Sequence, residues 1–216
     1  MNKVIVACNT LADELKTAVL ETCREYPILW VESGLHNSPQ LLKEKLQQVL
    51  DTVDRVDCVL LAFGFCGNSV LGIKAREYRL VIPRVEDCIT LLLGSDEKRK
   101  EASGTYFLTR GWLDYEKNIW EEYKFLVKKY GKERAERVFQ VMLGHYKNLG
   151  LIDTGAYSLE DVQKISCRVA RDLKLHHIVI EGTLDYMKKL LTGPYDEDFI
   201  IVPPGEEVTF DTLYGA

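Results

Sequence analysis

Residues 58–68 read Cys-Val-Leu-Leu-Ala-Phe-Gly-Phe-Cys-Gly-Asn, and this stretch decides the expected fold. The apolar run at 59–63 predicts a strand that is covered on both faces, as strands are in a parallel sheet. Gly64 ends the run and Gly67 follows Cys66, so the backbone is free to turn sharply and to approach a ligand closely. We therefore expect Cys66 on a glycine-flanked turn at the carboxyl end of a buried strand.

The rest of the chain alternates between strand and helix patterns. Further strands are predicted at 3–7, 28–31, 80–82, 105–109, 175–180 and 199–202. This alternation predicts an α/β protein with a doubly wound, mainly parallel, Rossmann-like sheet, folded as a single domain over residues 1–216. Residues 113–149 are charged and carry two apolar stripes, which we interpret as an inserted helical hairpin. Its aromatic stripes indicate either core packing or a homodimer contact.

Size, charge and cysteine usage exclude several classes of protein. A chain of 216 residues and 24.7 kDa can bury one substantial core. The net charge is −5 and the basic residues are scattered, which argues against a nucleic acid or an anionic membrane as partner. No apolar run has the length of a membrane span, and the start lacks the apolar core of a secretory signal. We therefore expect a cytoplasmic protein whose six cysteines are reduced.

Three of those cysteines are placed at one edge of the expected sheet. Cys8 follows the first strand, Cys66 the third and Cys88 the fourth. In a parallel sheet of order 2-1-3-4 these strands are neighbours about 4.8 Å apart, and ligands bind at their carboxyl ends. We therefore expect the three thiols to lie close together. The other cysteines are assigned to packing or to the surface: Cys23, Cys58 and Cys167.

Three thiolates with one open position suit a soft or borderline metal, so the sequence predicts a metal site formed by Cys8, Cys66 and Cys88. The metal would be zinc, or an iron–sulfur cluster with one iron left for a ligand. A fourth ligand would be exogenous or would come from a nearby side chain: Glu86, Asp87 or Asn68. The chain has no Cys-x-x-Cys pair, and the alternative that Cys8 and Cys88 are small buried hydrophobes stays open.

Two other interpretations need no metal. A helix expected to begin near Asn68 or Ser69 would place its positive end beside the Cys66 sulfur, which would make Cys66 the nucleophile of a cofactor-free enzyme. The other is a non-catalytic module that binds a corrinoid, a nucleotide or a partner protein. The chain lacks both the Asp-x-His-x-x-Gly corrinoid motif and a P-loop, which argues against the standard binding mode of either ligand.

Several residues are candidates for holding a small ligand beside the thiols. They are Gly64, Gly67, Asn68, Arg84, Thr109, Arg110 and Trp112. Arg84 and Arg110 offer planar guanidinium groups that bind a carboxylate or phosphate in a bidentate manner. A surface ion pair is the alternative for each arginine. Trp112 is interpreted either as part of a pocket wall or as an anchor for the helical hairpin.

Four motifs together resemble a known family. They are Cys8 after the first strand, Gly64-Phe-Cys66-Gly67-Asn68, Pro83-Arg84-x-x-Asp87-Cys88-Ile89, and Gly104-Thr105-Tyr106-x-x-Thr109-x-Gly111-Trp112. The chain resembles a domain-of-unknown-function family of methanogenic archaea and anaerobic bacteria that is often encoded near corrinoid-dependent methyltransferase systems. The resemblance implies, by association, a role in methyl transfer or metal-cofactor handling, with a corrinoid or a methyltransferase protein as partner.

Overall fold

The computed structural model describes residues 2–215 and confirms the α/β fold class. Its larger sheet has the strand order β2-β1-β3-β4-β8. The strands are β1 (Lys3–Cys8), β2 (Ile28–Val31), β3 (Cys58–Ala62), β4 (Arg79–Pro83) and β8 (Phe199–Val202). The first four pair in parallel in the predicted order 2-1-3-4, and β8 pairs antiparallel with β4 at one edge. All residues of β3 are buried, as its apolar run predicts.

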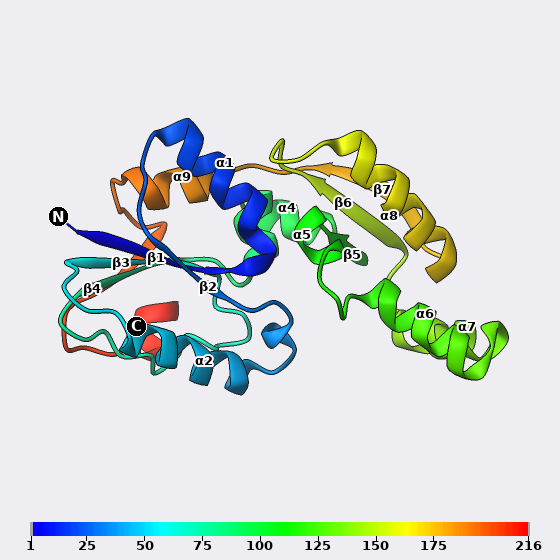
Figure 1. The fold of residues 1–216 in the computed structure, drawn as a ribbon, viewed down its shortest axis with the longest axis horizontal. Helices are drawn as coiled ribbons and strands as arrows, with labels where there is room; N and C mark the ends of the chain where they lie inside the picture. Colours follow the sequence, from blue (N-terminus) through cyan, green and yellow to red (C-terminus); the bar gives the residue numbers. More distant parts are fainter. Residues whose placement is uncertain (1, 216) are drawn as a thin grey trace.

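Helices cover both faces of the larger sheet (Figure 1). One face carries α1 (Ala12–Thr22) and α9 (Asp185–Thr192), and the opposite face carries α2 (Pro39–Asp51). Leu42, Leu46 and Leu50 recur at helical spacing along α2 and are buried, so that side of the helix supplies the core. Short 3-10 helices η1 (Asn9–Leu11) and η2 (Leu35–Asn37) follow β1 and β2.

The remaining strands form a second sheet of their own. It has the order β5-β6-β7, all parallel, with β5 (Thr105–Leu108), β6 (Asn148–Asp153) and β7 (His176–Glu181). Helix α8 (Leu159–Leu173) connects β6 to β7 and packs on this sheet. The strands predicted at 105–109 and 175–180 therefore exist, but they do not extend the first sheet. Figure 1 shows two lobes side by side, one built on each sheet.

Strand β6 was not predicted, and its sequence explains why. Asn148 and Gly150 are poor strand formers, and Leu149 continues the helical spacing of the preceding segment. Gly150 is required by packing in the central strand. A Cβ atom there would lie 2.7 Å from Thr105 Cγ2 and 2.8 Å from Ile180 Cδ1, so both neighbouring strands press on this position.

Within the interval 113–149, two helices form the predicted pair. They are α6 (Ile119–Tyr130) and α7 (Lys132–Met142), separated only by Gly131, and the short α5 (Arg110–Leu113) precedes them. The rings of Tyr123 and Phe139 meet edge to face at 5.3 Å, which holds the two helices together in the core of the second lobe. Asn118 begins α6 because its side chain accepts hydrogen bonds from the backbone N–H groups of Trp120 and Glu121.

Two segments near the larger sheet differ from the sequence prediction. The short helix expected to begin near Asn68 or Ser69 is replaced by turns over residues 66–72, because Gly72 has a φ of +75° and its N–H donates to the carbonyl of Val208. The chain end is ordered against this turn and forms α10 (Phe210–Tyr214). A bridge between Lys74 and Glu207 completes the contact. The tail thus packs on its own chain.

The helices after β4 begin where capping residues stand. Helix α3 (Cys88–Leu93) begins directly after Asp87, because Asp87 accepts a hydrogen bond from the backbone N–H of Thr90 at 2.7 Å. Helix α4 (Asp96–Glu101) is capped by Ser95, which accepts a hydrogen bond from the backbone N–H of Lys98.

In residues 2–215, no helix combines the length and the apolarity that crossing a membrane requires.

A buried carboxyl group lies where the lobes meet. Glu14 of α1 is fully buried, and its Oε1 accepts a hydrogen bond from Thr154, which follows β6, at 3.3 Å. Its Oε2 has no hydrogen-bond partner among residues 2–215. Because burial disfavours the charged form, the pKa of Glu14 rises to about 7.

Candidate functional site

A cavity of about 520 Å³ lies between the two lobes. One wall comes from the carboxyl ends of β1 and β3 and from the start of α3, and the opposite wall comes from β5, α5 and the segment that leads into α6. Clefts at the carboxyl ends of parallel strands are the usual ligand sites of doubly wound folds. The volume lies within the range of about 300–1,000 Å³ that is typical of small-molecule sites.

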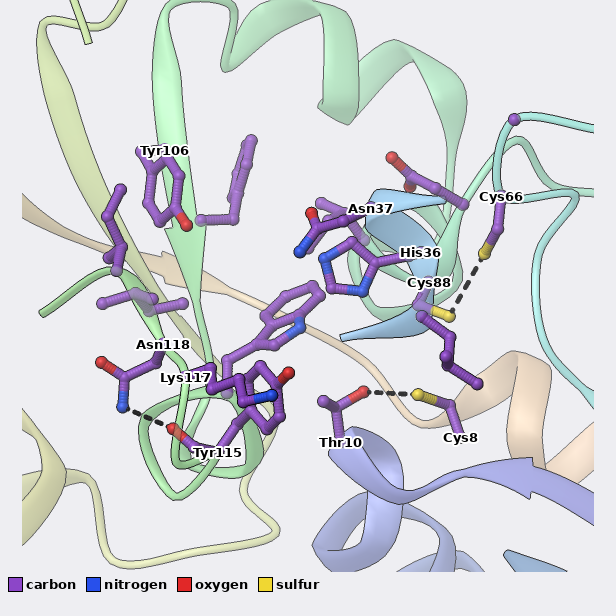
Figure 2. A pocket seen from close by; sticks show the side chains of 18 of the residues that line it. Cys8, Thr10, His36, Asn37, Cys66, Cys88, Tyr106, Tyr115, Lys117 and Asn118 are labelled. Atoms are coloured by element: carbon purple, nitrogen blue, oxygen red, sulfur yellow. Dashed lines mark hydrogen bonds between the residues drawn. The ribbon is translucent and has the colours of Figure 1, made fainter. Parts of the chain in front are cut away.

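All three predicted cysteines line this cavity (Figure 2). The sulfurs of Cys66 and Cys88 lie 3.9 Å apart. The sulfur of Cys8 lies 2.9 Å from Thr10 Oγ1, and Cys8 is close enough to Cys88 for the ionisation of one thiol to oppose that of the other. The topology therefore brings three thiols from distant parts of the sequence to one wall, as the strand order predicts.

The turn at Cys66 is fixed by backbone hydrogen bonds to the segment before α3. The N–H of Phe65 donates to Val85 O at 2.9 Å, and the N–H of Cys66 donates to Glu86 O at 2.8 Å. Cys66 itself has a φ of +44°, which a residue with a side chain adopts only when its surroundings hold it there. These contacts set the position of Cys66 relative to Cys88.

Gly64 serves this turn by allowing two backbones to meet. A Cβ atom on Gly64 would lie 2.5 Å from the backbone of Asp87, so any side chain would push the turn away from α3. The backbone of Gly64 also hydrogen-bonds the thiol of Cys88. Gly64 was predicted to allow a ligand to approach the backbone closely. In the structure it allows the close approach of the segment that carries Cys88.

The helix expected near Asn68 or Ser69 does not form. Gly67 and Asn68 have φ values of +67° and +66°, and residues 66–72 make consecutive turns. The helix that was expected to place its positive end beside Cys66 is therefore not formed by this turn, and the electrostatic argument that depended on it loses its basis.

Burial keeps two of the thiols protonated. Burial is the main cause that raises the pKa of Cys8 to about 12, and repulsion from a thiolate at Cys88 is the second cause. The pKa of Cys88 is also raised well above its usual value, first by its hydrogen bond with Cys66 and then by burial. Neither thiol becomes a thiolate near neutral pH without a compensating positive charge.

The opposite wall is aromatic and polar. Trp112 is half-buried, lines the cavity as the pocket-wall interpretation expects, and meets the ring of His36 edge to face at 6.4 Å. Tyr106, Tyr115 and Lys117 line the same wall (Figure 2). Sequence reasoning missed these three residues and His36. Only Tyr106 carried a signal, since it lies within the Gly104–Trp112 motif.

Arg99 links this wall to the thiol wall. Its guanidinium lies 3.5 Å from Asp87 Oδ2 and stacks over the ring of Phe107 at 4.5 Å. Asp87 also caps α3 through its Oδ1. Both carboxylate oxygens of Asp87 are thus engaged, which removes it as a fourth metal ligand in this arrangement.

Four of the predicted ligand-binding side chains do not line the cavity. Arg84 donates to the backbone carbonyls of Glu197, Thr212 and Leu213 and so holds the chain end; it does not line the cavity. Arg110 lies 3.7 Å from Asp13 and 3.4 Å from Asp114, which is the ion-pair alternative.

Thr109 and Asn68 complete this group. Thr109 is buried at the start of α5, and its hydroxyl has no partner within residues 2–215. Asn68 is exposed and accepts a hydrogen bond from the hydroxyl of Tyr214. Of the seven predicted ligand-binding residues, Gly67 and Trp112 line the cavity.

The three cysteines outside the site lie where the sequence places them. Cys58 is buried at the start of β3, and Cys23 and Cys167 are exposed. As the side chains stand, no group of three or more His, Cys, Asp or Glu residues within 2–215 is arranged to hold a metal ion. The sulfurs of Cys66 and Cys88 are close enough to bind one metal ion. The thiol of Cys8 is hydrogen-bonded to Thr10 and is directed toward it rather than toward the other two sulfurs.

Comparison with known proteins identifies the family. The profile of a family described as "Protein of unknown function (DUF1638)" matches residues 30–191. The chain belongs to this family. The match includes Cys66 and Cys88 and extends from β2 into α9, and thus spans both lobes; Cys8 precedes it. No curated protein and no solved structure matches the chain.

Proposed function

We propose that this DUF1638 protein binds one thiophilic metal ion, with zinc as the best fit, through Cys66, Cys88 and Cys8. The open coordination position would face the cavity between the lobes and take a small ligand. The observation that carries the proposal is the 3.9 Å distance between the sulfurs of Cys66 and Cys88.

That distance favours a single ion over a cluster. Two thiolates on one tetrahedral zinc, with Zn–S bonds of about 2.3 Å, have sulfurs about 3.8 Å apart. In a four-iron cluster held by three cysteines each cysteine binds a different iron, which requires a wider separation of the sulfurs. The pair therefore fits a mononuclear site without rearrangement.

The protonation of the thiols supports the same proposal. Buried neutral thiols lining a cavity give little packing benefit, and Arg99, which lines the same cavity, pairs with Asp87. A bound divalent ion lowers the pKa of a coordinating thiol enough to deprotonate it and likewise lowers the pKa of a thiol or water in the open position. Cys8 would complete the set by rotating its thiol away from Thr10.

The chemistry of the cavity indicates the class of ligand. Its opposite wall offers aromatic faces and the polar groups of His36, Tyr115 and Lys117, which would orient a small molecule with a polar end. The resemblance to proteins encoded near corrinoid-dependent methyltransferases suggests a thiol that accepts a methyl group as the ligand. A corrinoid would then belong to a partner protein, because its macrocycle and tail exceed a cavity of this size.

Elemental analysis of protein purified without oxygen tests this proposal. We expect about one metal ion per chain, lost in Cys66→Ser and Cys88→Ser and more weakly bound in Cys8→Ser. Cys167→Ser is the matched control, because that thiol is exposed and far from the cavity in sequence and fold. Metal retained by all three cavity variants would overturn the proposal. Iron with acid-labile sulfide and a visible absorbance band would replace the single ion by a cluster.

A further inference from the structure

The segment that leads into α10 packs against the turns that follow Cys66. The N–H of Gly72 donates to Val208 O at 2.7 Å, and the N–H of Val208 donates to Ile73 O at 2.9 Å. Val208 is buried, so this contact has both a backbone and an apolar part. A capping box at Thr209 then begins the helix. Helix α10 therefore starts from a fixed point on these turns.

Tyr214 of α10 contacts residues on both sides of Cys66. Its hydroxyl donates a hydrogen bond to Asn68 Oδ1, and its ring meets the ring of Phe65 edge to face at 5.8 Å. Cys66, Gly67 and Asn68 all have positive φ values, at +44°, +67° and +66°. A residue with a side chain keeps such a conformation only where surrounding contacts hold it there. Tyr214 supplies a contact of this kind at Asn68.

Arg84 joins α10 to the segment that leads to Cys88. Its Nη1 donates to Leu213 O at 2.9 Å, a carbonyl of the last helical turn that has no partner within the helix. Arg84 directly follows β4 and lies two positions before Glu86, whose carbonyl accepts the N–H of Cys66 at 2.8 Å. Helix α10 therefore bridges the two segments that carry Cys66 and Cys88.

A guanidinium group suits this bridge because it donates in several directions at once. Besides Leu213, Arg84 reaches Thr212 O at 3.2 Å through Nη1 and Glu197 O at 3.1 Å through Nε. A lysine at this position would keep the positive charge but lose the planar fork that reaches these carbonyls together.

We propose that Arg84, Asn68 and Tyr214 are positioning residues that keep the Cys66 sulfur beside the Cys88 sulfur. This inference rests on the proposed metal site, because it assigns these residues a role in forming it. Backbone hydrogen bonds to the segment before α3 hold the turn up to Cys66, and α10 holds it beyond Cys66, at Asn68. Without α10 the turn relaxes from its positive φ values, and the 3.9 Å distance between the sulfurs is no longer maintained.

A competitive zinc assay on the full chain is the first test. Tyr214→Phe removes the hydroxyl and keeps the ring, so zinc binding should weaken about fivefold, the effect of one ordinary hydrogen bond. Arg84→Gln should weaken it by about tenfold or more, because several hydrogen bonds from a charged group are lost. Arg84→Lys should lie between Arg84→Gln and the parent protein. Tyr195→Phe is the matched control, since it removes a hydroxyl that donates to Leu190 O at 2.9 Å and does not line the cavity.

The disulfide equilibrium of the metal-free protein tests the positions of the sulfurs without zinc. The exposed thiols are first removed by Cys23→Ser and Cys167→Ser. Cys66 and Cys88 then form a disulfide by giving two electrons and two protons to oxidised glutathione, which leaves as two thiols. Because this equilibrium depends on how closely the two thiols are held, its constant should fall about fivefold in Tyr214→Phe. A loss of global stability alone would leave an equilibrium between two folded forms unchanged.

The two measurements separate this inference from the metal site itself. If Arg84→Gln, or Tyr214→Phe where Arg84→Gln does not fold, binds zinc and forms the disulfide as the parent protein does, the proposal is overturned. Weaker zinc binding with an unchanged disulfide equilibrium also contradicts it, because the sulfurs would then be positioned without α10. A parent protein that binds no zinc would overturn the metal site, and the disulfide equilibrium would still decide whether α10 positions the thiols.

Discussion

The thiol sulfurs of Cys66 and Cys88 lie 3.9 Å apart although 22 positions separate the residues in sequence. The two thiols approach each other because the turn after β3 is hydrogen-bonded to the segment that precedes α3. Backbone hydrogen bonds, and not side-chain packing alone, therefore maintain the distance between the Cys66 and Cys88 sulfurs. Consequences for metal binding, oxidation and folding follow from this geometry.

Metal binding should release protons. Because burial holds Cys8 and Cys88 in the thiol form, Zn²⁺ added to metal-free protein at pH 7.5 must displace their protons. In isothermal titration calorimetry we expect the observed binding enthalpy to vary linearly with the ionisation enthalpy of the buffer, with a slope that gives the number of protons released. Cys88→Ser should release fewer protons and bind more weakly. Tight binding without proton release would show that the ion binds elsewhere.

Oxidation of the metal-free protein should join Cys66 to Cys88. The sulfurs need to close from 3.9 Å to about 2.05 Å, a movement within the reach of two side-chain rotations. Peptide mapping after mild oxidant treatment should find this disulfide. It should also form in Cys8→Ser, and prior loading with Zn²⁺ should slow its formation at least tenfold. A disulfide that includes Cys8 in place of Cys66 would mean that the thiol arrangement differs from the one described.

Replacing Gly64 by alanine should disturb the metal site through the backbone. The added Cβ atom would lie 2.5 Å from the backbone of Asp87, and relief of this overlap should cost about 1–3 kcal/mol of unfolding free energy. Because Cys88 follows Asp87, metal affinity should fall as well. Chemical denaturation and a competitive zinc assay measure the two effects. Gly144→Ala is the control, since Gly144 is exposed and lies outside the cavity.

Glu14 should make stability depend on pH. Its pKa of about 7 in the folded protein lies above the usual value of 4.5, mainly because of burial, so the folded state holds a proton that the unfolded chain releases. The stabilisation is complete below about pH 4.5 and is lost as the pH rises to about 7, an effect of about 3 kcal/mol.

The variant Glu14→Gln isolates this contribution, because it stays neutral at every pH. Between pH 4.5 and pH 7.5, urea denaturation should show its stability rising relative to the parent protein. Asp13 adds negative charge near Glu14 and opposes its ionisation. A constant difference between parent and variant across this range would place the pKa of Glu14 near its usual value.

The thiol site followed from the sequence because it depends on topology. A parallel sheet of order 2-1-3-4 brings the ends of β1, β3 and β4 together whatever the surrounding side chains are, so Cys8, Cys66 and Cys88 were predictable. The N-terminal cap of α4 at Ser95 depends only on local sequence and was predictable for that reason.

The features that the sequence concealed depend on tertiary contacts. Gly150 weakens the strand pattern of β6, yet the strands on either side require a glycine there. Gly72 interrupts an apparent helix only because the distant chain end pairs with that segment. His36 joins the cavity because the second lobe packs across the sheet edge, and nothing in residues 32–37 indicates that contact.

X-ray absorption at the zinc edge tests the central claim most directly. The protein should be purified without oxygen, loaded with one equivalent of Zn²⁺ and compared with Cys66→Ser. The account predicts two to three sulfur ligands at about 2.3 Å in the parent protein and one fewer in the variant. A shell of only nitrogen and oxygen at about 2.0–2.1 Å in the parent protein would contradict it.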